Sequence, residues 1–389
     1  MQKILSSSEI IDLIARNLPS DIDKTSFIQC NKHLFNHKHL LRFDRIYVLN
    51  NNNSDKIENV TNVLIAPDFK GSISNDSISL PKLTNLNTGR YYNEPTNFSK
   101  FHHLTHLELG KFFDQKINLY RNSLTHLTLH ARRQCRQIDF SQLPDLTYLE
   151  LHFAKTVSID NPSRLTHLNL CYTKLTIFNN LSYLTHLFIA SCEVQSIDLT
   201  PVINLSHLTI KNGSINIMHI DLPHITSLTN ITHLTLLCFT NNPINFNDFP
   251  KLTHLILGSE YTYQLDKLNL PLLTNFSYNQ NKIVNMSNLP SLKRLTYGSE
   301  FNKRIKTPLP RTITRIVFGP NFNHPIENIL PQKLENLTLG IRFSYQIIGV
   351  IPPSVSNLNI ITVGFKSKAL ENLIKQLWTS TKMKINFIQ

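Results

Sequence analysis

The sequence contains little glycine, tryptophan and cysteine, and it has no long apolar run. Its 389 residues include 10 glycines and one tryptophan. Scarce glycine argues against a phosphate-binding loop, and neither a G-x-S-x-G nor an H-E-x-x-H motif occurs. No stretch of about 18 apolar residues is present, so we expect no membrane span. Residues 1–14 carry Glu9 and Asp12 and do not read as a signal peptide.

The five cysteines are widely spaced. Their number is odd, the nearest two are 21 residues apart, and no C-x-x-C occurs. This pattern argues against a disulfide framework and against a cysteine-rich zinc site. We therefore expect an intracellular protein, cytoplasmic or nuclear, without a metal or cofactor. The cysteines are Cys30, Cys135, Cys171, Cys192 and Cys238.

Basic residues are in excess, but they are scattered. The formal net charge is +13 and the isoelectric point is about 9.5. No run of five or more lysines and arginines occurs, so the charge indicates a solvated surface rather than a nucleic-acid footprint. Asparagine is abundant, with 43 residues, and it can replace glycine at turns.

A short phrase, Leu-Thr-His-Leu-x-Leu, recurs along the chain. Its first position, which we number offset 0, occurs fifteen times at a mean spacing of about 21 residues. Such a period is the signature of a repeat architecture, in which each unit buries its apolar side against its neighbours. Offset 0 falls at Val60, Leu83, Leu104, Leu124, Leu146, Leu165, Leu184, Leu205, Ile231, Leu252, Leu273, Leu292, Ile313, Leu334 and Val355.

The repeat that begins at Ile313 shows the order of elements within one unit. Apolar residues at offsets 3 and 5 alternate with polar ones, which is the period of a half-buried strand. Gly319 and Asn321 then favour a turn, and Phe322 and Ile326 should face the core from the return path. About 21 residues leave no room for a three-turn helix, so we expect an extended return path or single 3₁₀ turns.

Prolines keep the same place in many repeats, two or three residues before offset 0. The strand ladder does not need an N–H there. We therefore predict a mainly β, leucine-rich-repeat-like solenoid of about 15 repeats. Its parallel strands should lie about 4.8 Å apart, with offsets 2 and 4 on the concave side. The prolines are Pro81, Pro144, Pro162, Pro250, Pro271, Pro290, Pro310 and Pro331.

The best-preserved repeats resemble the FNIP repeat family. Its pattern is a strand ending in Phe-Gly, then Phe-Asn-x-Pro-Ile, then Leu-Pro. Between residues 128 and 250 only the strand phrase persists, so the full motif covers about four repeats. The resemblance implies a leucine-rich-repeat-like solenoid and no catalytic residues. The matching positions are Phe318, Gly319, Phe322, Asn323, Pro325, Ile326, Leu330 and Pro331, with partial matches after Gly110, Gly298 and Gly340.

Residues before Val60 do not follow the repeat. Residues 8–18 predict an amphipathic helix that ends at a proline, and a second helix should follow. This segment resembles an F-box, although Ser7 and Ser8 replace the usual opening Leu-Pro and no tryptophan closes it. The resemblance implies a surface that binds a Skp-type adaptor of cullin–RING ubiquitin ligases. Alternatively, the helices only cap the solenoid. The adaptor-binding residues would be Leu18, Pro19, Asp21, Ile22 and Ile28.

These patterns divide the chain into three parts. We expect an F-box-like helical domain over residues 1–50, a repeat solenoid over 55–365 and a C-terminal cap over 366–389. Within the cap, apolar residues at helical spacing predict a helix over 368–377, and a last strand should follow around 383–388.

Histidine recurs at offset 2, where alternation sends side chains away from the core. We expect a ladder with about 5 Å between strands that belongs to a protein-binding face. Zinc needs converging ligands, and neighbouring strands hold side chains parallel, so we expect no metal on the ladder. The threonine at offset 1 should bond the backbone. Alternatively, the histidines form a pH-sensitive surface, or they are only a product of repeat duplication. The histidines are His106, His126, His167, His186, His207, His233 and His254.

The sequence therefore favours a binding protein over an enzyme. The expected function is substrate recognition in a cullin–RING ubiquitin ligase, with a Skp-type adaptor and a protein substrate as partners. No small-molecule substrate, membrane or nucleic acid is expected. The alternative is a stand-alone interaction scaffold, and an enzyme with an unrecognised site is a third reading.

Overall fold

The computed structural model describes most of the repeat region. The predicted F-box-like helices, with Leu18, Pro19, Asp21, Ile22 and Ile28, and the predicted helix over 368–377 lie outside the described residues. The described residues are 47–52, 60–74, 78–119, 123–130, 138–153, 157–159, 164–173, 175–178, 181–192, 196–211, 220–265, 268–345, 347, 349–361 and 384–388.

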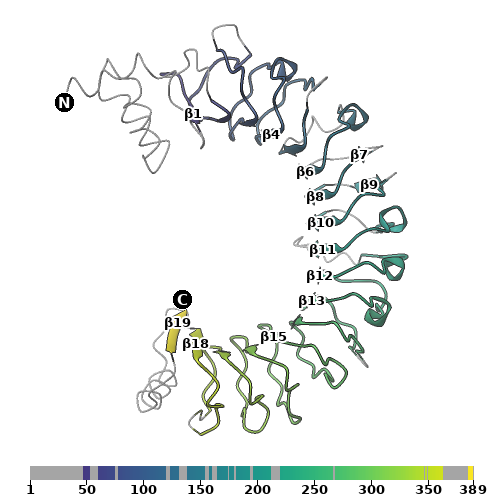
Figure 1. Ribbon diagram of the computed structural model, residues 1–389, viewed down its shortest axis with the longest axis vertical. Helices are drawn as coiled ribbons and strands as arrows, with labels where there is room; N and C mark the ends of the chain where they lie inside the picture. Colours follow the sequence, from purple (N-terminus) through teal and green to yellow (C-terminus); the bar gives the residue numbers. More distant parts are fainter. Residues whose placement is uncertain are drawn as a thin grey trace, which may run out of the picture. The chain divides into compact units, whose positions relative to one another are not determined.

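The chain forms two compact units. The first comprises Met1–Leu184 and Ser191–Glu193, and the second comprises Thr185–Ala190 and Val194–Gln389. In each unit successive coils contribute strands to a parallel sheet, as Figure 1 shows. The predicted boundaries near residues 50 and 366 border segments outside the described residues and stay predictions.

The sheet of the first unit follows the chain order β1-β2-β3-β4-β5-β6-β8. All its neighbouring strands are parallel. Two short strands, β7 (Val157–Ile159) and β9 (Leu175–Phe178), pair with each other in a separate sheet. The main strands are β1 (Tyr47–Leu49), β2 (Asn62–Ile65), β3 (Asn85–Asn87), β4 (His106–Leu109), β5 (His126–Leu129), β6 (Tyr148–His152) and β8 (His167–Cys171).

The sheet of the second unit is also parallel and in chain order, from β10 to β19. Its last strand, β19 (Lys384–Ile388), confirms the strand predicted around residues 383–388. The others are β10 (His186–Ala190), β11 (His207–Lys211), β12 (His233–Leu237), β13 (His254–Leu257), β14 (Asn275–Tyr278), β15 (Arg294–Tyr297), β16 (Arg315–Val317), β17 (Asn336–Leu339) and β18 (Asn357–Ile361).

The strands confirm the predicted repeat register. Each of the fifteen predicted repeats starts its strand at offset 2, from Asn62 of β2 to Asn357 of β18. Neighbouring strands pair offset for offset, so that His207 lies opposite His233. Since one residue of slippage would turn every apolar side chain outward, burial of offsets 3 and 5 fixes this register. The chain is therefore a parallel-strand solenoid, as predicted.

The core lies on one face of each sheet and is closed by the return path. In the repeat of β13, Leu252, Leu255 and Leu257 at offsets 0, 3 and 5 are at most 1% exposed. Phe322 and Ile326, predicted to reach the core from the return path, are equally buried. We call the opposite face of each sheet, which carries offsets 2 and 4, the open face.

The return path contains single 3₁₀ turns, as the repeat length predicted. Three of them begin after an asparagine or aspartate whose side chain accepts a hydrogen bond from the N–H two residues later. Asn97 and Asn245 therefore serve turns. Among the described residues, the 3₁₀ helices are η2 (Phe98–Lys100), η4 (Phe140–Gln142), η5 (Thr200–Val202), η6 (Ile225–Ser227) and η7 (Phe246–Asp248).

Glycine and asparagine hold successive coils together after β16. A Cβ atom on Gly319 would collide with the carbonyl oxygen of Gly298 in the preceding coil, so this close approach requires glycine. The asparagine that directly follows a buried phenylalanine links neighbouring coils. The Asn323 N–H donates to Asn302 Oδ1, and the Ser344 N–H donates to Asn323 Oδ1, both at 3.0 Å. These bonds explain the Phe-Asn element of the repeat.

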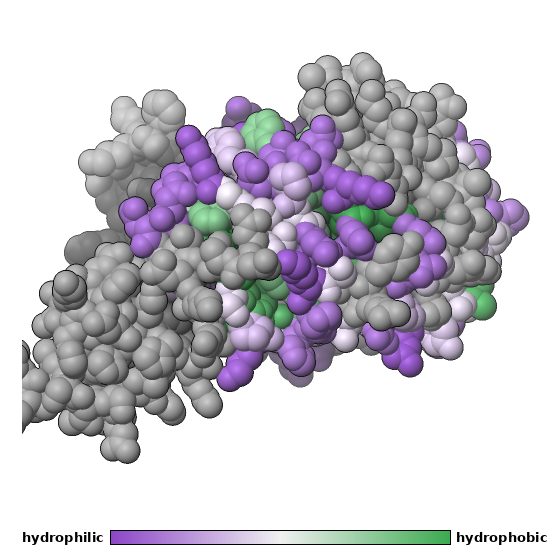
Figure 2. Space-filling view, turned by 90° about the horizontal axis from the view of Figure 1, so that it is seen from above, coloured by the Kyte–Doolittle hydropathy of each residue, from purple (hydrophilic) through white to green (hydrophobic). Residues whose placement is uncertain are grey.

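The coloured part of the face seen in Figure 2 is largely polar. Hydrophilic residues make up most of the coloured surface in Figure 2, and hydrophobic residues appear there as small patches. Within the described ranges, no helix has the length and apolar character needed to cross a membrane. The three described cysteines, Cys171, Cys192 and Cys238, are buried, and no disulfide joins any two of them.

Candidate functional site

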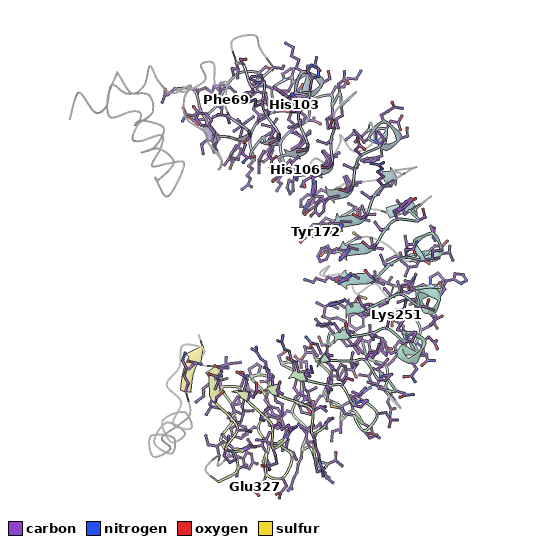
Figure 3. The ribbon with its side chains drawn as sticks, viewed as in Figure 1. Phe69, His103, His106, Tyr172, Lys251 and Glu327 are labelled. Atoms are coloured by element: carbon purple, nitrogen blue, oxygen red, sulfur yellow. The ribbon has the colours of Figure 1, made fainter. Side chains whose placement is uncertain are left out.

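The predicted histidine ladder exists, and its rings are stacked. In the first unit, the ring centroids of His106 and His126 are 4.0 Å apart. In the second unit, the rings of His186, His207, His233 and His254 follow one another at 4.0–4.1 Å. All the rings are half-buried, and His106 lies on the face of the strands away from the return path (Figure 3).

A hydroxyl at offset 1 orients each ladder ring. At β5, His126 Nδ1 lies 2.9 Å from Thr125 Oγ1, and this hydroxyl donates its hydrogen to the Thr105 carbonyl. A hydroxyl has one hydrogen, so Thr125 accepts from the imidazole. The network therefore assigns the proton of the neutral ring to Nδ1 and leaves Nε2 as an acceptor. The same pairs are Thr105–His106, Thr166–His167, Thr185–His186, Ser206–His207, Thr232–His233 and Thr253–His254.

The environment of the ladder favours neutral rings. Partial burial lowers the pKa of His106, and burial together with repulsion from His106 lowers the pKa of His126. In the second unit, burial, followed by repulsion from His254 and other ladder members, lowers the pKa of His233 to about 4. Burial and then the charge of Arg294 lower the pKa of His254. At neutral pH these four rings therefore act as uncharged hydrogen-bonding groups.

A groove of about 390 Å³ lies on the open face of the first unit. Its polar wall includes the Asn87 side-chain amide, which donates to Glu108 Oε2 at 2.7 Å. The groove thus places a carboxylate beside two ladder histidines. It is lined by Asn62, Val63, Leu64, Asn85, Leu86, Asn87, His106, Leu107, Glu108, His126, Thr128 and Tyr148.

An exposed aromatic pair was not predicted from the sequence. Tyr91 and Phe112 stack at 5.5 Å between ring centroids although they are 53% and 48% exposed. The Arg90 guanidinium lies 5.5 Å and 5.8 Å from the two ring centroids. Both aromatic residues stand at offset 8 of neighbouring repeats, so this recurrence was the available signal. Arginine and stacked aromatic rings are enriched in protein interfaces.

The predicted adaptor-binding residues and the ladder remain predictions as binding sites. The adaptor-binding positions lie outside the described residues. The ladder rings are nearly parallel, with interplanar angles of 13–15° between the stacked histidine pairs. Parallel rings aim their Nε2 lone pairs in similar directions rather than at one point, which does not suit tetrahedral zinc.

The coils that carry the glycine and asparagine contacts match the model of a repeat family. Residues 301–342 and 322–362 match the FNIP Repeat family model. The match falls on the repeats in which Phe322 and Asn323 complete the Phe-Asn element. The coils of residues 301–362 are therefore similar to FNIP repeats, and they form part of a parallel-strand solenoid.

Other comparisons are more distant. No curated protein matches the sequence. The crystal structure of CroV588, a circular LRR protein, is 20% identical over 85% of this chain and 74% of its own, with a TM-score of 0.32. The InlJ functional domain of Listeria monocytogenes is 15% identical over 85% and 65%, with a TM-score of 0.47. TLR13, from its complex with ssRNA13, is 13% identical over 90% and 74%, with a TM-score of 0.40.

Proposed function

We propose that this FNIP-repeat chain is a substrate-recognition subunit of a cullin–RING ubiquitin ligase. Its open face would bind a protein substrate, and its N-terminal segment would bind a Skp-type adaptor. The observation that carries the binding role is the stacked histidine ladder, which presents rings of one tautomer at a regular spacing. The proposal assigns no chemical reaction to this chain.

The chemistry of the open face indicates what the substrate offers. A neutral ring with its proton on Nδ1 accepts a hydrogen bond at Nε2, and the nearby Glu108 carboxylate is also an acceptor. Glu108 is 43% exposed, so a partner can reach it. The complementary surface is a polypeptide segment that presents N–H and O–H donors, including basic side chains.

The adaptor part of the proposal is supported by the sequence alone, through the Leu-Pro-x-Asp-Ile segment at residues 18–22. Under the alternative, a stand-alone scaffold, the same residues would only cap the first coil. The two functions differ in one observable property, which is whether a Skp-type adaptor binds the chain.

We predict that Pro19→Arg abolishes binding of the adaptor. Contact with an apolar helical surface would strip water from the added arginine charge without giving it a partner, and this costs free energy. Co-purification of a Skp-type adaptor with the full chain measures the effect, and circular dichroism checks the fold. The matched control is Pro81→Arg, because Pro81 is an exposed proline at a repeat boundary. If the wild-type chain retains no adaptor, the scaffold function is correct instead.

We predict that exchanging His106 and His126 together for asparagine weakens substrate capture. Asparagine already occupies offset 2 at Asn85, so the strand register should survive and the melting temperature should change little. The shorter asparagine side chains do not reach the positions of the two Nε2 acceptors, and loss of two hydrogen bonds at about 0.5–1.5 kcal/mol each should lower affinity by about 5- to 150-fold. Quantitative mass spectrometry of proteins captured from a eukaryotic lysate measures the change.

The control for this double variant is His103→Asn, which alters an exposed histidine outside the ladder. The proposal requires that the double variant lose captured proteins that the wild type and His103→Asn both retain. An identical set of captured proteins in all three samples would show that the open face of the first unit is not the binding surface.

A further inference from the structure

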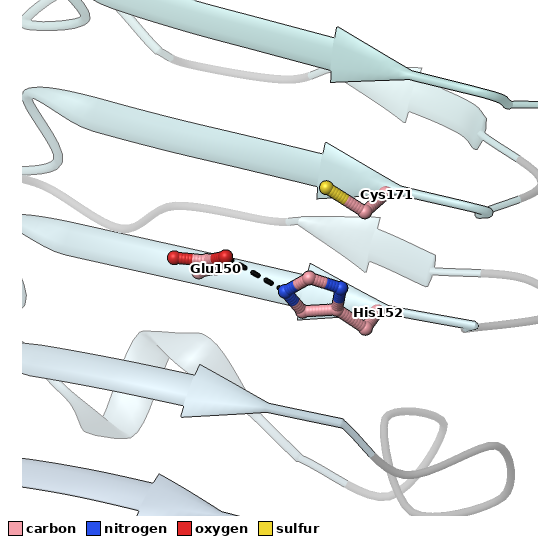
Figure 4. A group of neighbouring side chains, drawn as sticks. All are labelled: Glu150, His152 and Cys171. Atoms are coloured by element: carbon pink, nitrogen blue, oxygen red, sulfur yellow. Dashed lines mark hydrogen bonds and ion pairs between the residues drawn. The ribbon is translucent and has the colours of Figure 1, made fainter. Parts of the chain in front are cut away.

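Three side chains with different metal-binding atoms meet at the ends of β6 and β8. Glu150, His152 and Cys171 each offer one possible ligand atom, and these atoms lie within 4.8 Å of one another. Figure 4 shows the carboxylate and the imidazole side by side on β6, with the thiol on the adjacent strand. This group is separate from the ladder, which occupies offset 2.

The parallel register brings the three residues together. His152 and Cys171 are direct partners across β6 and β8, and both stand at offset 6. Glu150 precedes His152 by two residues, so alternation places both on the same side of the strand. Cys171 is 9% exposed, while the side chains of His152 and Glu150 are 17% and 24% exposed. The group is thus held by regular backbone and partly shielded from water.

Hydrogen bonds fix the carboxylate in place. Tyr148 Oη donates to Glu150 Oε2 at 2.6 Å, and Asn169 Nδ2 donates to Tyr148 Oη at 2.8 Å. The second carboxylate oxygen, Oε1, lies 2.7 Å from His152 Nε2. Burial raises the pKa of Glu150, but the hydrogen bonds of Tyr148 and His152 outweigh it, so the net pKa is lowered and the carboxylate is charged. The His152 ring also packs 4.2 Å from that of His130, centroid to centroid.

We propose that Glu150, His152 and Cys171 bind a zinc ion, with water as the fourth ligand. Thiolate sulfur, imidazole nitrogen and carboxylate oxygen are the three ligand types that zinc takes in proteins. Bond lengths of about 2.0–2.3 Å in a tetrahedron require ligand atoms roughly 3.3–3.7 Å apart, so side-chain adjustments of about an ångström close the site. The ladder lacks this convergence.

Binding also has a defined proton balance. The ion replaces the hydrogen between His152 Nε2 and Glu150 Oε1, and the neutral imidazole keeps one proton by carrying it on Nδ1. The Cys171 thiol loses its proton to water and coordinates as the thiolate. Zinc binding should therefore release one proton per site, and its affinity should fall in acid.

Cobalt substitution tests the site. The full chain is first treated with a chelator and then titrated with Co²⁺ alone. We expect one equivalent to produce the visible bands of tetrahedral cobalt and a thiolate-to-cobalt charge-transfer band in the near ultraviolet. Added Zn²⁺ should remove both. Histidines elsewhere can bind cobalt weakly, but only a cysteine ligand gives the charge-transfer band.

Two variants and one control assign the ligands. Cys171→Ser should lose the charge-transfer band, and His152→Gln should weaken Co²⁺ binding by at least about tenfold. The matched control is Cys238→Ser, a buried cysteine in the second unit whose thiol pKa is raised to about 12 by burial. The control should bind like the wild type. Circular dichroism confirms that each variant is folded.

The proposal is wrong if the wild-type chain shows no charge-transfer band, or if Cys171→Ser retains it. If Cys171→Ser does not fold, unchanged cobalt affinity in His152→Gln overturns the proposal equally well. Tyr148→Phe provides a further test of positioning: without the hydrogen bond to Glu150 Oε2, Co²⁺ affinity should fall about 10–100-fold while the charge-transfer band persists.

Discussion

Truncation of Leu255 to alanine is expected to destabilise the second unit by about 2–5 kcal/mol. Leu255 is fully buried at offset 3 of β13, between Leu234 of β12 and Phe276 of β14. Removal of its isobutyl group leaves a cavity that these neighbours only partly fill. Urea denaturation followed by circular dichroism measures the loss.

The loss of stability should be confined to the coils near Leu255, because coils of a solenoid contact only their neighbours. Amide protection measured by hydrogen exchange should fall first around residues 231–292 and little near Val355. The matched control is Ile256→Ala, because Ile256 follows Leu255 directly but is 40% exposed on the open face. Equal destabilisation by both variants would contradict the assignment of faces, and uniform loss of protection would contradict local coupling.

Most of the fold could be predicted because its signal is periodic. The recurrence of one apolar phrase located all fifteen strands, and alternation within Ile313–Phe318 separated core from surface correctly. The short period also led to the 3₁₀ return path. These features follow from burial, and burial determines the spacing of apolar residues along the sequence.

The details of the open face could only partly be predicted. The sequence indicated a histidine row at strand spacing, but not the 4.0 Å stacking of His106 on His126. The tautomer depends on two contacts of Thr125, one to a ring and one to the preceding coil. The second contact joins residues 20 positions apart and leaves no compositional signal of its own.

The Glu150, His152 and Cys171 group shows a second limit of sequence analysis. A search for metal-binding spacings examines residues close in sequence, whereas Cys171 lies one repeat after His152. The pair could have been found only by comparing the same offset in adjacent repeats. Absence of a C-x-x-C motif therefore argued against one class of zinc site and left this arrangement untested.

Acidification below about pH 6.5 is expected to destabilise the second unit through its ladder. The His233 pKa is lowered to about 4, whereas a histidine in the unfolded chain titrates near 6.5. Between these values the unfolded chain binds more protons, so stability falls as the pH falls. The contribution is fully present above about pH 6.5 and is lost progressively toward pH 4.

The urea midpoint of the full chain, measured in steps from about pH 7.5 to pH 5, tests this expectation. Carboxylates of unfolded chains titrate near pH 4, so in this range the histidines dominate the slope. Exchange of His207 and His233 for asparagine should flatten the pH dependence, because the exchange removes two titrating rings. The strand should tolerate asparagine, since β14 already carries Asn275 at offset 2. The control is His224→Asn, at an exposed, left-handed position that asparagine tolerates. A slope that survives the double variant unchanged would mean that other groups bind the protons and that stacking does not hold the ladder neutral.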